Sequence, residues 1–161
     1  MLDLDYRLRI LGVCKRNTAL VLGYVPQTGF GNSPEYGNAE REINSLVSDL
    51  IKSVINTFIF IRWSTFEEQF LSALRHIDGN AFRYRSILLC KRDNLYIEKE
   101  PDGFFDTIEY IDDYYLEPDE FLERLLFVCG TVVSYNKEDI RLLAEVEKMA
   151  RNSRKKVISI K

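Results

Sequence analysis

The sequence predicts a mainly α-helical fold, in which a helical bundle with a long central helix carries one or two small β-hairpins. Apolar residues recur at alternating intervals of three and four from Ile43 to Leu74, which is the spacing of an amphipathic helix. Two further helical patterns, each with its own start signal, lie between Glu117 and Asn152. Strand-like alternation is short and weak by comparison.

The length and composition are those of one globular domain. The chain has 161 residues, of which 46% are hydrophobic and 29% charged, and a chain of this size can bury a sizeable core. We expect a single domain over 1–161. Residues 1–32 would form a hairpin or a helix plus a loop, and 33–161 a helical core with a central insertion.

Membrane and export signals are absent from the sequence pattern. No apolar run reaches the roughly 18 residues of a membrane span, and the acidic start "MLDLDYRLRI" does not resemble a signal peptide. We therefore expect a cytoplasmic protein without membrane contact. The three cysteines are far apart, so we expect buried thiols and no metal site.

The N-terminal segment can be interpreted in two ways. Residues 6–25 contain two loosely alternating apolar runs around "KRNT", which favours a hairpin. Leu8, Leu11 and Cys14 also have helical spacing, so strand and helix both remain open. The glycine-rich "QTGFGNSPEYGN" that follows predicts a loop.

The long central helix is expected to begin at Ser33 and Pro34 and to end near Asp78 to Asn80. A kink is expected near Asn56 and Thr57. Without a break, about 40 helical residues would extend roughly 60 Å, which exceeds a compact domain of this size. The sequence therefore predicts a break or a partner chain along the helix.

The second half of the chain is less regular. Residues 82–99 favour a hairpin turning at "KRDN", with strand or helix left open, and "FDTIEYIDDYYL" favours a short acidic helix. A helix is predicted over "EPDEFLERLLFVCGTVVSY", with Pro118 in its first turn and Val132 on its buried face. The last helix, "NKEDIRLLAEVEKMARN", would be capped by Asn136.

Charge is distributed unevenly around a net value of −3. The stretch 98–123 is strongly acidic, and every charged residue from Lys148 onward is basic. A nearly neutral total can hide a local anion-binding surface. The acidic stretch is a candidate surface for a protein partner.

Aromatic and acidic residues lie close together in "RWSTFEEQF". Aromatic residues at helical spacing usually pack, so we expect Trp63, Phe66 and Phe70 in the core, with Glu67 and Glu68 on a solvated edge. The functional alternative is a glutamate held near a basic site on a neighbouring helix.

The motif "ARNSRKK" at the end of the last helix has a structural and a functional interpretation. Arg151 suits the helix dipole and Asn152 suits a C-cap, which needs no activity. The order of a long aromatic-acid helix and a terminal helix ending in "RN" also resembles the HEPN family of small helical domains, over roughly Ala39 to Lys156. That family presents an RNxxxH motif.

The resemblance implies a homodimer and a metal-independent endoribonuclease of the defence or toxin–antitoxin type. It implies catalytic roles for Arg151, Asn152 and Lys156, the last standing where the family has its histidine. Lysine, with a reference pKa of about 10.4, stabilises phosphate charge better than it abstracts protons. The motif as it stands therefore favours a degenerate, non-cleaving RNA binder or a much slower enzyme, and His76 is a speculative substitute base.

Further RNA contacts are expected from basic residues beside aromatic ones. Arginine with aromatic side chains can hold single-stranded RNA by charge and stacking, although a hairpin with a solvated basic face has the same pattern. The candidates are Arg75, Arg83, Arg85, Arg154 and Lys155.

The predicted function is thus RNA binding or cleavage by a HEPN-like domain, with enzymatic activity left undecided and with no cofactor and no metal. No P-loop, GxGxxG, GxSxG or HExxH motif occurs. The alternative is a non-catalytic helical protein-interaction module such as an antitoxin, an immunity protein or a regulatory protein.

Overall fold

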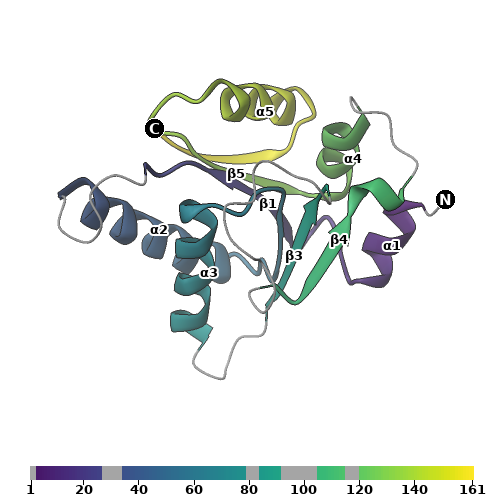
Figure 1. The fold of residues 1–161 in the computed structure, drawn as a ribbon, viewed down its shortest axis with the longest axis horizontal. Coiled ribbons are helices and arrows are strands. Elements are labelled where there is room, and N and C mark those ends of the chain that lie inside the picture. The colour runs from purple at the N-terminus through teal and green to yellow at the C-terminus, as the bar shows by residue number, and fades with distance from the viewer. Residues whose placement is uncertain (1–2, 27–33, 79–83, 92–104, 115–119) are drawn as a thin grey trace.

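The computed structural model describes residues 3–26, 34–78, 84–91, 105–114 and 120–161 (Figure 1). The helices in these ranges are α1 (Leu4–Ile10), α2 (Pro34–Lys52), α3 (Thr65–Asp78), the 3₁₀ turn η1 (Ile111–Asp113), α4 (Glu120–Val128) and α5 (Arg141–Asn152). The strands are β1 (Thr18–Gly23), β2 (Thr57–Phe60), β3 (Arg85–Cys90), β4 (Thr107–Tyr110), β5 (Thr131–Tyr135) and β6 (Lys156–Ile160).

The described strands form one parallel sheet in the order β4-β3-β2-β1-β5-β6. Helices α2 and α3 pack on one face, and α1, α4 and α5 pack on the other (Figure 1). The mainly α-helical, HEPN-like fold predicted from the sequence is therefore wrong, because the structure is an α/β sandwich with a doubly wound parallel sheet.

The central strands are apolar on both sides because helices cover both faces of the sheet. In β1, Ala19 and Val21 face the α2–α3 layer, whereas Leu20 and Leu22 face the opposite layer. Every residue of β1, β2 and β5 is buried. A fully buried strand has no polar side to produce alternation, so its sequence does not show the pattern of a half-exposed strand.

The predicted long helix is three elements: α2, β2 and α3. Helix α2 ends at Lys52, and Val54 then adopts a positive φ of 69°. The apolar run after it forms β2, which pairs with β1 from Thr57 onward. The expected kink of a helix near Asn56 and Thr57 is wrong, because the helix has already ended at Lys52 and Thr57 begins a strand.

Other elements also differ from expectation. Residues 6–25 form a helix followed by a strand and not a hairpin, and residues 84–91 contain β3, which pairs in parallel with β2 and β4. The rest of the predicted second hairpin lies outside the described residues. The expected acidic helix is β4 and η1, and Val132 lies in β5. Helices α4 and α5 confirm two predicted helices only in part, because α4 ends at Val128 and α5 begins at Arg141, with Ile140 and not Asn136 as its N-cap. The terminal "KVISI" is β6.

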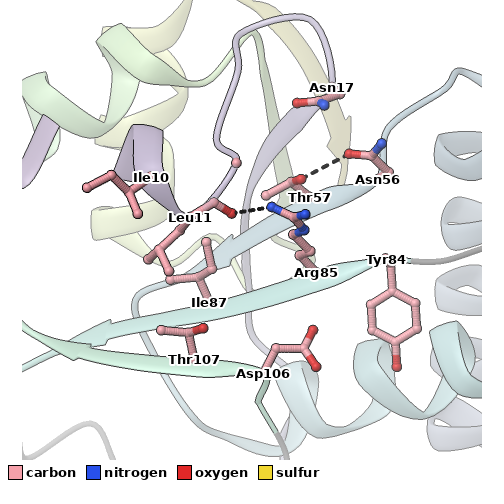
Figure 2. Close-up of a pocket in the computed structure, with 11 residues that line it drawn as sticks. Ile10, Leu11, Asn17, Asn56, Thr57, Tyr84, Arg85, Ile87, Asp106 and Thr107 are labelled. Carbon is pink, nitrogen blue, oxygen red and sulfur yellow. Dashed lines mark hydrogen bonds between the residues drawn. The ribbon is translucent and has the colours of Figure 1, made fainter. Parts of the chain in front are cut away.

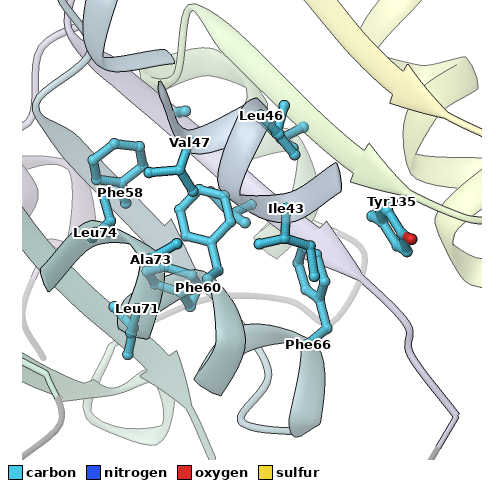
Figure 3. Close-up of a cluster of buried hydrophobic side chains, with 14 of the residues drawn as sticks. Ile43, Leu46, Val47, Phe58, Phe60, Phe66, Leu71, Ala73, Leu74 and Tyr135 are labelled. Carbon is cyan, nitrogen blue, oxygen red and sulfur yellow. The ribbon is translucent and has the colours of Figure 1, made fainter. Parts of the chain in front are cut away.

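The core between the sheet and the α2–α3 layer is dominated by aromatic side chains (Figure 3). Phe70 packs edge-on against Phe58 at 5.5 Å and against Phe60 at 5.7 Å between ring centroids. Trp63 and Phe66 are also buried, which confirms the expected core role of these aromatics. Such burial contributes roughly 1.5–3 kcal/mol for each large apolar side chain. Cys90 and Cys129 are buried as expected, whereas Cys14 is exposed.

The loop between α1 and β1 rests directly on the start of β5. A Cβ atom added to Gly130 would lie 2.2 Å from the carbonyl oxygen of Lys15. This obstacle is backbone, which cannot rotate away as a side chain can.

We expect Gly130→Ala to lower the free energy of unfolding by about 1–3 kcal/mol, because the methyl group overpacks this backbone contact. Urea denaturation measures the change. The control Ser72→Ala, on the exposed side of α3, should stay within about 0.5 kcal/mol of the wild type. Equal stability of the two variants would contradict the close contact.

Candidate ligand-binding site at the carboxyl edge of the sheet

The strand order creates a topological switch point between β1 and β5. The chain leaves β1 toward α2 on one face of the sheet and leaves the adjacent β5 toward α5 on the other face. In open α/β sheets, ligands bind outside the carboxyl ends of the strands at this position. We call the residues around the ends of β1 and β5 the switch-point site.

An aromatic stack forms the base of the switch-point site. Phe66, in the first turn of α3, stacks on Tyr135 at the end of β5, with centroids 5.6 Å apart and planes 19° apart (Figure 3). A Cβ atom on Gly23 would lie 2.5 Å from the Phe66 ring. Glycine at the end of β1 therefore lets α3 approach both strands closely.

An ion pair joins the loop after β5 to α2. Lys137 Nζ lies 2.5 Å from Glu42 Oε1, and both side chains are partly exposed. Burial, together with the charge of Glu42, raises the pKa of Tyr135 to about 12, so its hydroxyl remains protonated at neutral pH. Asn136 orders the same loop by accepting from Ile140 N–H at 2.6 Å and donating to Ile140 O at 3.1 Å.

Glu67 is a buried acid in the first turn of α3. Ser64 Oγ donates to Glu67 Oε2 at 2.5 Å, and Ser64 O accepts from the Glu68 N–H at 3.0 Å. This S-x-x-E arrangement has the spacing of a capping box. The expected solvated edge is therefore wrong for Glu67, whose exposure is 0%.

The burial of Glu67 exceeds what a cap requires. Its Oε1 atom is buried and has no hydrogen-bond partner among the described residues. Burial raises the pKa of Glu67 to about 7, against opposing effects from Ser64 and Arg62. A carboxyl group that titrates near neutrality can act as a proton donor or acceptor. The capping-box spacing in "STFE" was the available sequence signal for this residue.

The residues predicted to be catalytic are not brought together with His76. Arg151 NH1 donates to the buried Glu147 Oε2 at 3.2 Å, four residues earlier in α5. Asn152 ends α5 and Lys156 begins β6, both exposed. His76 lies in the last turn of α3, across the sheet from α5.

Arg151 has a structural role as the ion-pair partner of the buried Glu147. Burial alone would raise the pKa of Glu147, but hydrogen bonds including those from Ser159 and Arg151 outweigh it, so the pKa lies below its ordinary value. Ser159 Oγ donates to Oε1 at 3.0 Å, and Lys161 Nζ lies 3.9 Å from Oε2. The cluster attaches α5 to the edge strand β6.

The residues predicted to bind RNA occupy separate places. Lys155 lines a hollow of about 610 Å³ with Lys15 and Phe127, and its pKa is lowered by burial and by Lys15. Arg154 is exposed beside it, in the turn from α5 to β6, with a φ of 59°.

The remaining predicted RNA contacts lie around the second half of α3 and the strand after it. Arg75 is exposed on α3, whereas Arg85 lines a second hollow at the amino edge of the sheet. Arg83 lies outside the described residues.

Part of the acidic stretch is used inside the fold. Glu109 of β4 accepts from Arg7 of α1 and from Tyr114, each at 2.7 Å. Much of 98–123 lies outside the described residues, so a protein partner on this stretch stays a prediction.

Comparison with protein-family models and with curated proteins gives no match for this chain. In the described ranges, no helix combines the length and apolar character needed to cross a membrane. The same ranges contain no cluster of three or more His, Cys, Asp or Glu side chains that could hold a metal ion.

Glu67→Gln should remove a pH dependence of stability. The pKa of Glu67 is about 7 in the folded chain and near 4.5 in the unfolded chain. The protonated carboxyl group therefore contributes its full stabilisation of the fold below pH 4.5, and this contribution is lost as pH rises through 7. Relative to Glu67→Gln, the wild type should lose on the order of 3 kcal/mol between pH 4.5 and 8. Glutamine preserves the cap.

Urea denaturation at pH 5, 6, 7 and 8 measures this difference. Glu68→Gln, at the next and less buried position, is the control and should follow the wild-type profile. Parallel profiles for the wild type and Glu67→Gln would show that Glu67 titrates normally.

Arg151→Ala should lower the free energy of unfolding by about 1 kcal/mol. The loss is modest because Arg151 is 53% exposed and because Ser159 and Lys161 still face Glu147. Chemical denaturation checks it against Lys148→Ala, an exposed position on the same helix. If the two variants unfold together, the ion pair contributes nothing to stability.

Proposed function

We propose that this chain is a ligand-binding α/β domain that takes a nucleotide or a similar phosphorylated compound at the switch-point site. The observation that carries the proposal is the strand order, which makes β1 and β5 neighbours with exits to opposite faces. Doubly wound sheets of this kind bind nucleotides outside the carboxyl ends of their strands.

The order of elements around β1 supports a phosphate ligand. A strand is followed by a glycine-containing segment and then by a helix of 19 residues, α2. The segment contains Gly29 and Gly31 in the sequence "QTGFGNS", and lies outside the described residues. Strand, glycine-rich segment and helix N-terminus form the usual setting for phosphate recognition, because helix N-termini present free N–H groups to anions.

One side chain at the switch-point site has the chemistry for such a ligand. Lys137 supplies a cation that is 40% exposed in its ion pair with Glu42. Glu67 follows Phe66 of the aromatic stack but is fully buried, so it does not contact a ligand directly. Its pKa of about 7 makes its protonation sensitive to a charge bound nearby. The proposal is for binding.

The RNA function predicted from the sequence stays a prediction. It depended on a helical bundle whose terminal motif faces a second copy, and the chain does not have that architecture. In the described structure, Arg151 has a structural partner in Glu147. We therefore do not carry the ribonuclease hypothesis further.

Calorimetric titration with adenosine mono-, di- and triphosphate tests the proposal. We expect binding by the wild type and about tenfold weaker binding by Lys137→Gln, since a hydrogen bond to a charged group contributes about 1.5–3 kcal/mol. Lys52→Gln removes an exposed lysine from the far end of α2 and should bind like the wild type.

Two results would contradict the proposal. One is the absence of heat with all three nucleotides at millimolar concentration. The other is equal weakening by Lys137→Gln and Lys52→Gln, which would indicate a general effect of net charge.

A further inference from the structure

A hollow lies at the amino edge of the sheet, where the strands begin (Figure 2). The switch-point site lies at the other edge, where the strands end. The volume of the hollow is about 780 Å³, within the range of small-molecule sites. The starts of β2, β3 and β4 line it together with the turn after α1. It is therefore separate from the switch-point site and independent of the function proposed above.

The backbone around this hollow is held by hydrogen bonds between neighbouring elements. The carbonyl oxygen of Asn17 accepts from the N–H groups of Asn56 and Thr57, each at 3.0 Å. The carbonyl of Asn56 in turn accepts from the Arg85 N–H at 2.8 Å. These bonds fix the positions from which the side chains of Asn17, Asn56 and Arg85 extend.

Arg85 is positioned by the turn after α1. Its NH1 atom donates to the carbonyl oxygen of Leu11 at 2.7 Å, and a Cβ atom on Gly12 would lie 1.8 Å from NH1. Gly12 also has a φ of 91°, which favours glycine. Within the described chain, the Leu11 bond is the one hydrogen bond of the Arg85 side chain, so other guanidinium N–H groups remain available.

Two asparagine side chains line the same hollow. Thr18 Oγ1 donates to Asn17 Oδ1 at 3.0 Å, and Thr57 Oγ1 donates to Asn56 Oδ1 at 2.9 Å. Among the described residues, each amide oxygen accepts a hydrogen bond, whereas neither NH₂ group donates one. Figure 2 shows the Arg85 guanidinium between the Leu11 carbonyl and the Asn56–Thr57 pair.

One oxygen of the acid in this hollow, Asp106, accepts hydrogen bonds from Ser86. Asp106 Oδ2 accepts from the Ser86 N–H at 2.8 Å and lies 3.4 Å from Ser86 Oγ. Apolar side chains, including Ile10 and Leu11, complete the lining. Ile10 is 57% exposed, so it offers apolar surface at the rim of the hollow.

We propose that this hollow binds a small organic anion. Its carboxylate or phosphate group is held by Arg85 and by the NH₂ groups of Asn17 and Asn56, and its apolar part lies against Ile10 and Leu11. Arginine suits such oxyanions because its planar fork of donors matches their geometry.

The experiment is an NMR titration of the ¹⁵N-labelled chain with phenyl phosphate, benzoate and inorganic phosphate. Side-chain NH₂ resonances of Asn17 and Asn56 report binding directly. We expect both to shift, and phenyl phosphate or benzoate to bind more tightly than inorganic phosphate because of the apolar lining. The tighter of the two organic probes identifies the preferred head group.

Asn56→Asp is the decisive variant, since it keeps the shape and the oxygen bound by Thr57 but replaces the donor with a negative charge. We expect at least about tenfold weaker binding, because a charge-assisted donor becomes a like charge. Asn44→Asp makes the same change on the exposed side of α2 and should leave affinity unchanged. If Asn56→Asp fails to fold, Arg85→Gln takes its place with the same expectation.

The proposal is overturned if the Asn17 and Asn56 resonances do not move with any probe at millimolar concentration. It is also overturned if Asn56→Asp and Asn44→Asp bind equally well. Neither result would affect nucleotide binding at the switch-point site, which Lys137→Gln reports and these variants do not.

Discussion

The structure depends on the complete burial of β1. Its backbone pairs with β2 on one side and with β5 on the other, and its side chains alternate between two apolar layers. A parallel strand in this position needs helices on both faces of the sheet. That requirement sends the chain from β1 to α2 and from β5 to α5 on opposite faces, and the switch-point site follows from it.

Both edges of the sheet are held by main-chain hydrogen bonds and by side-chain contacts. At the amino edge, the main-chain carbonyls of Asn17 and Asn56 accept from N–H groups of neighbouring strands, and Arg85 donates to the Leu11 carbonyl. At the carboxyl edge, Tyr24 N–H donates to the Tyr135 carbonyl, and Phe66 stacks on Tyr135. Each edge therefore holds its side chains on a fixed backbone, which is what a preformed ligand site requires.

The sequence predicted elements whose pattern is local and missed those that depend on the sheet. Helices α4 and α5 are amphipathic and lie on the surface, so their periodicity reports one buried face. The residues of β2, "TFIF", are buried on both sides, and their apolar run continues the spacing of α2 without interruption. Length and pattern alone do not separate such a strand from a buried helical segment.

The site could be predicted only where its signal was local. The capping-box spacing from Ser64 to Glu67 is visible in the sequence, but the burial of Glu67 depends on what α3 packs against. Arg151 illustrates the reverse case, since "RN" at a helix end suited both catalysis and a cap. Its partner Glu147 lies one helical turn earlier. The sequence shows that the two residues have i,i+4 spacing, but it does not show that Glu147 is buried against the sheet.

Glu67 connects the stability of the fold to the proposed function. A capping box can form at the protein surface, so its glutamate does not need to be buried. The Glu67 carboxyl group is nevertheless buried, and its Oε1 atom has no hydrogen-bond partner in the described structure. Its pKa of about 7 places its titration in the neutral pH range. A ligand that prefers either form will therefore take up or release a proton when it binds, and its affinity will depend on pH in the range where the fold itself loses stability.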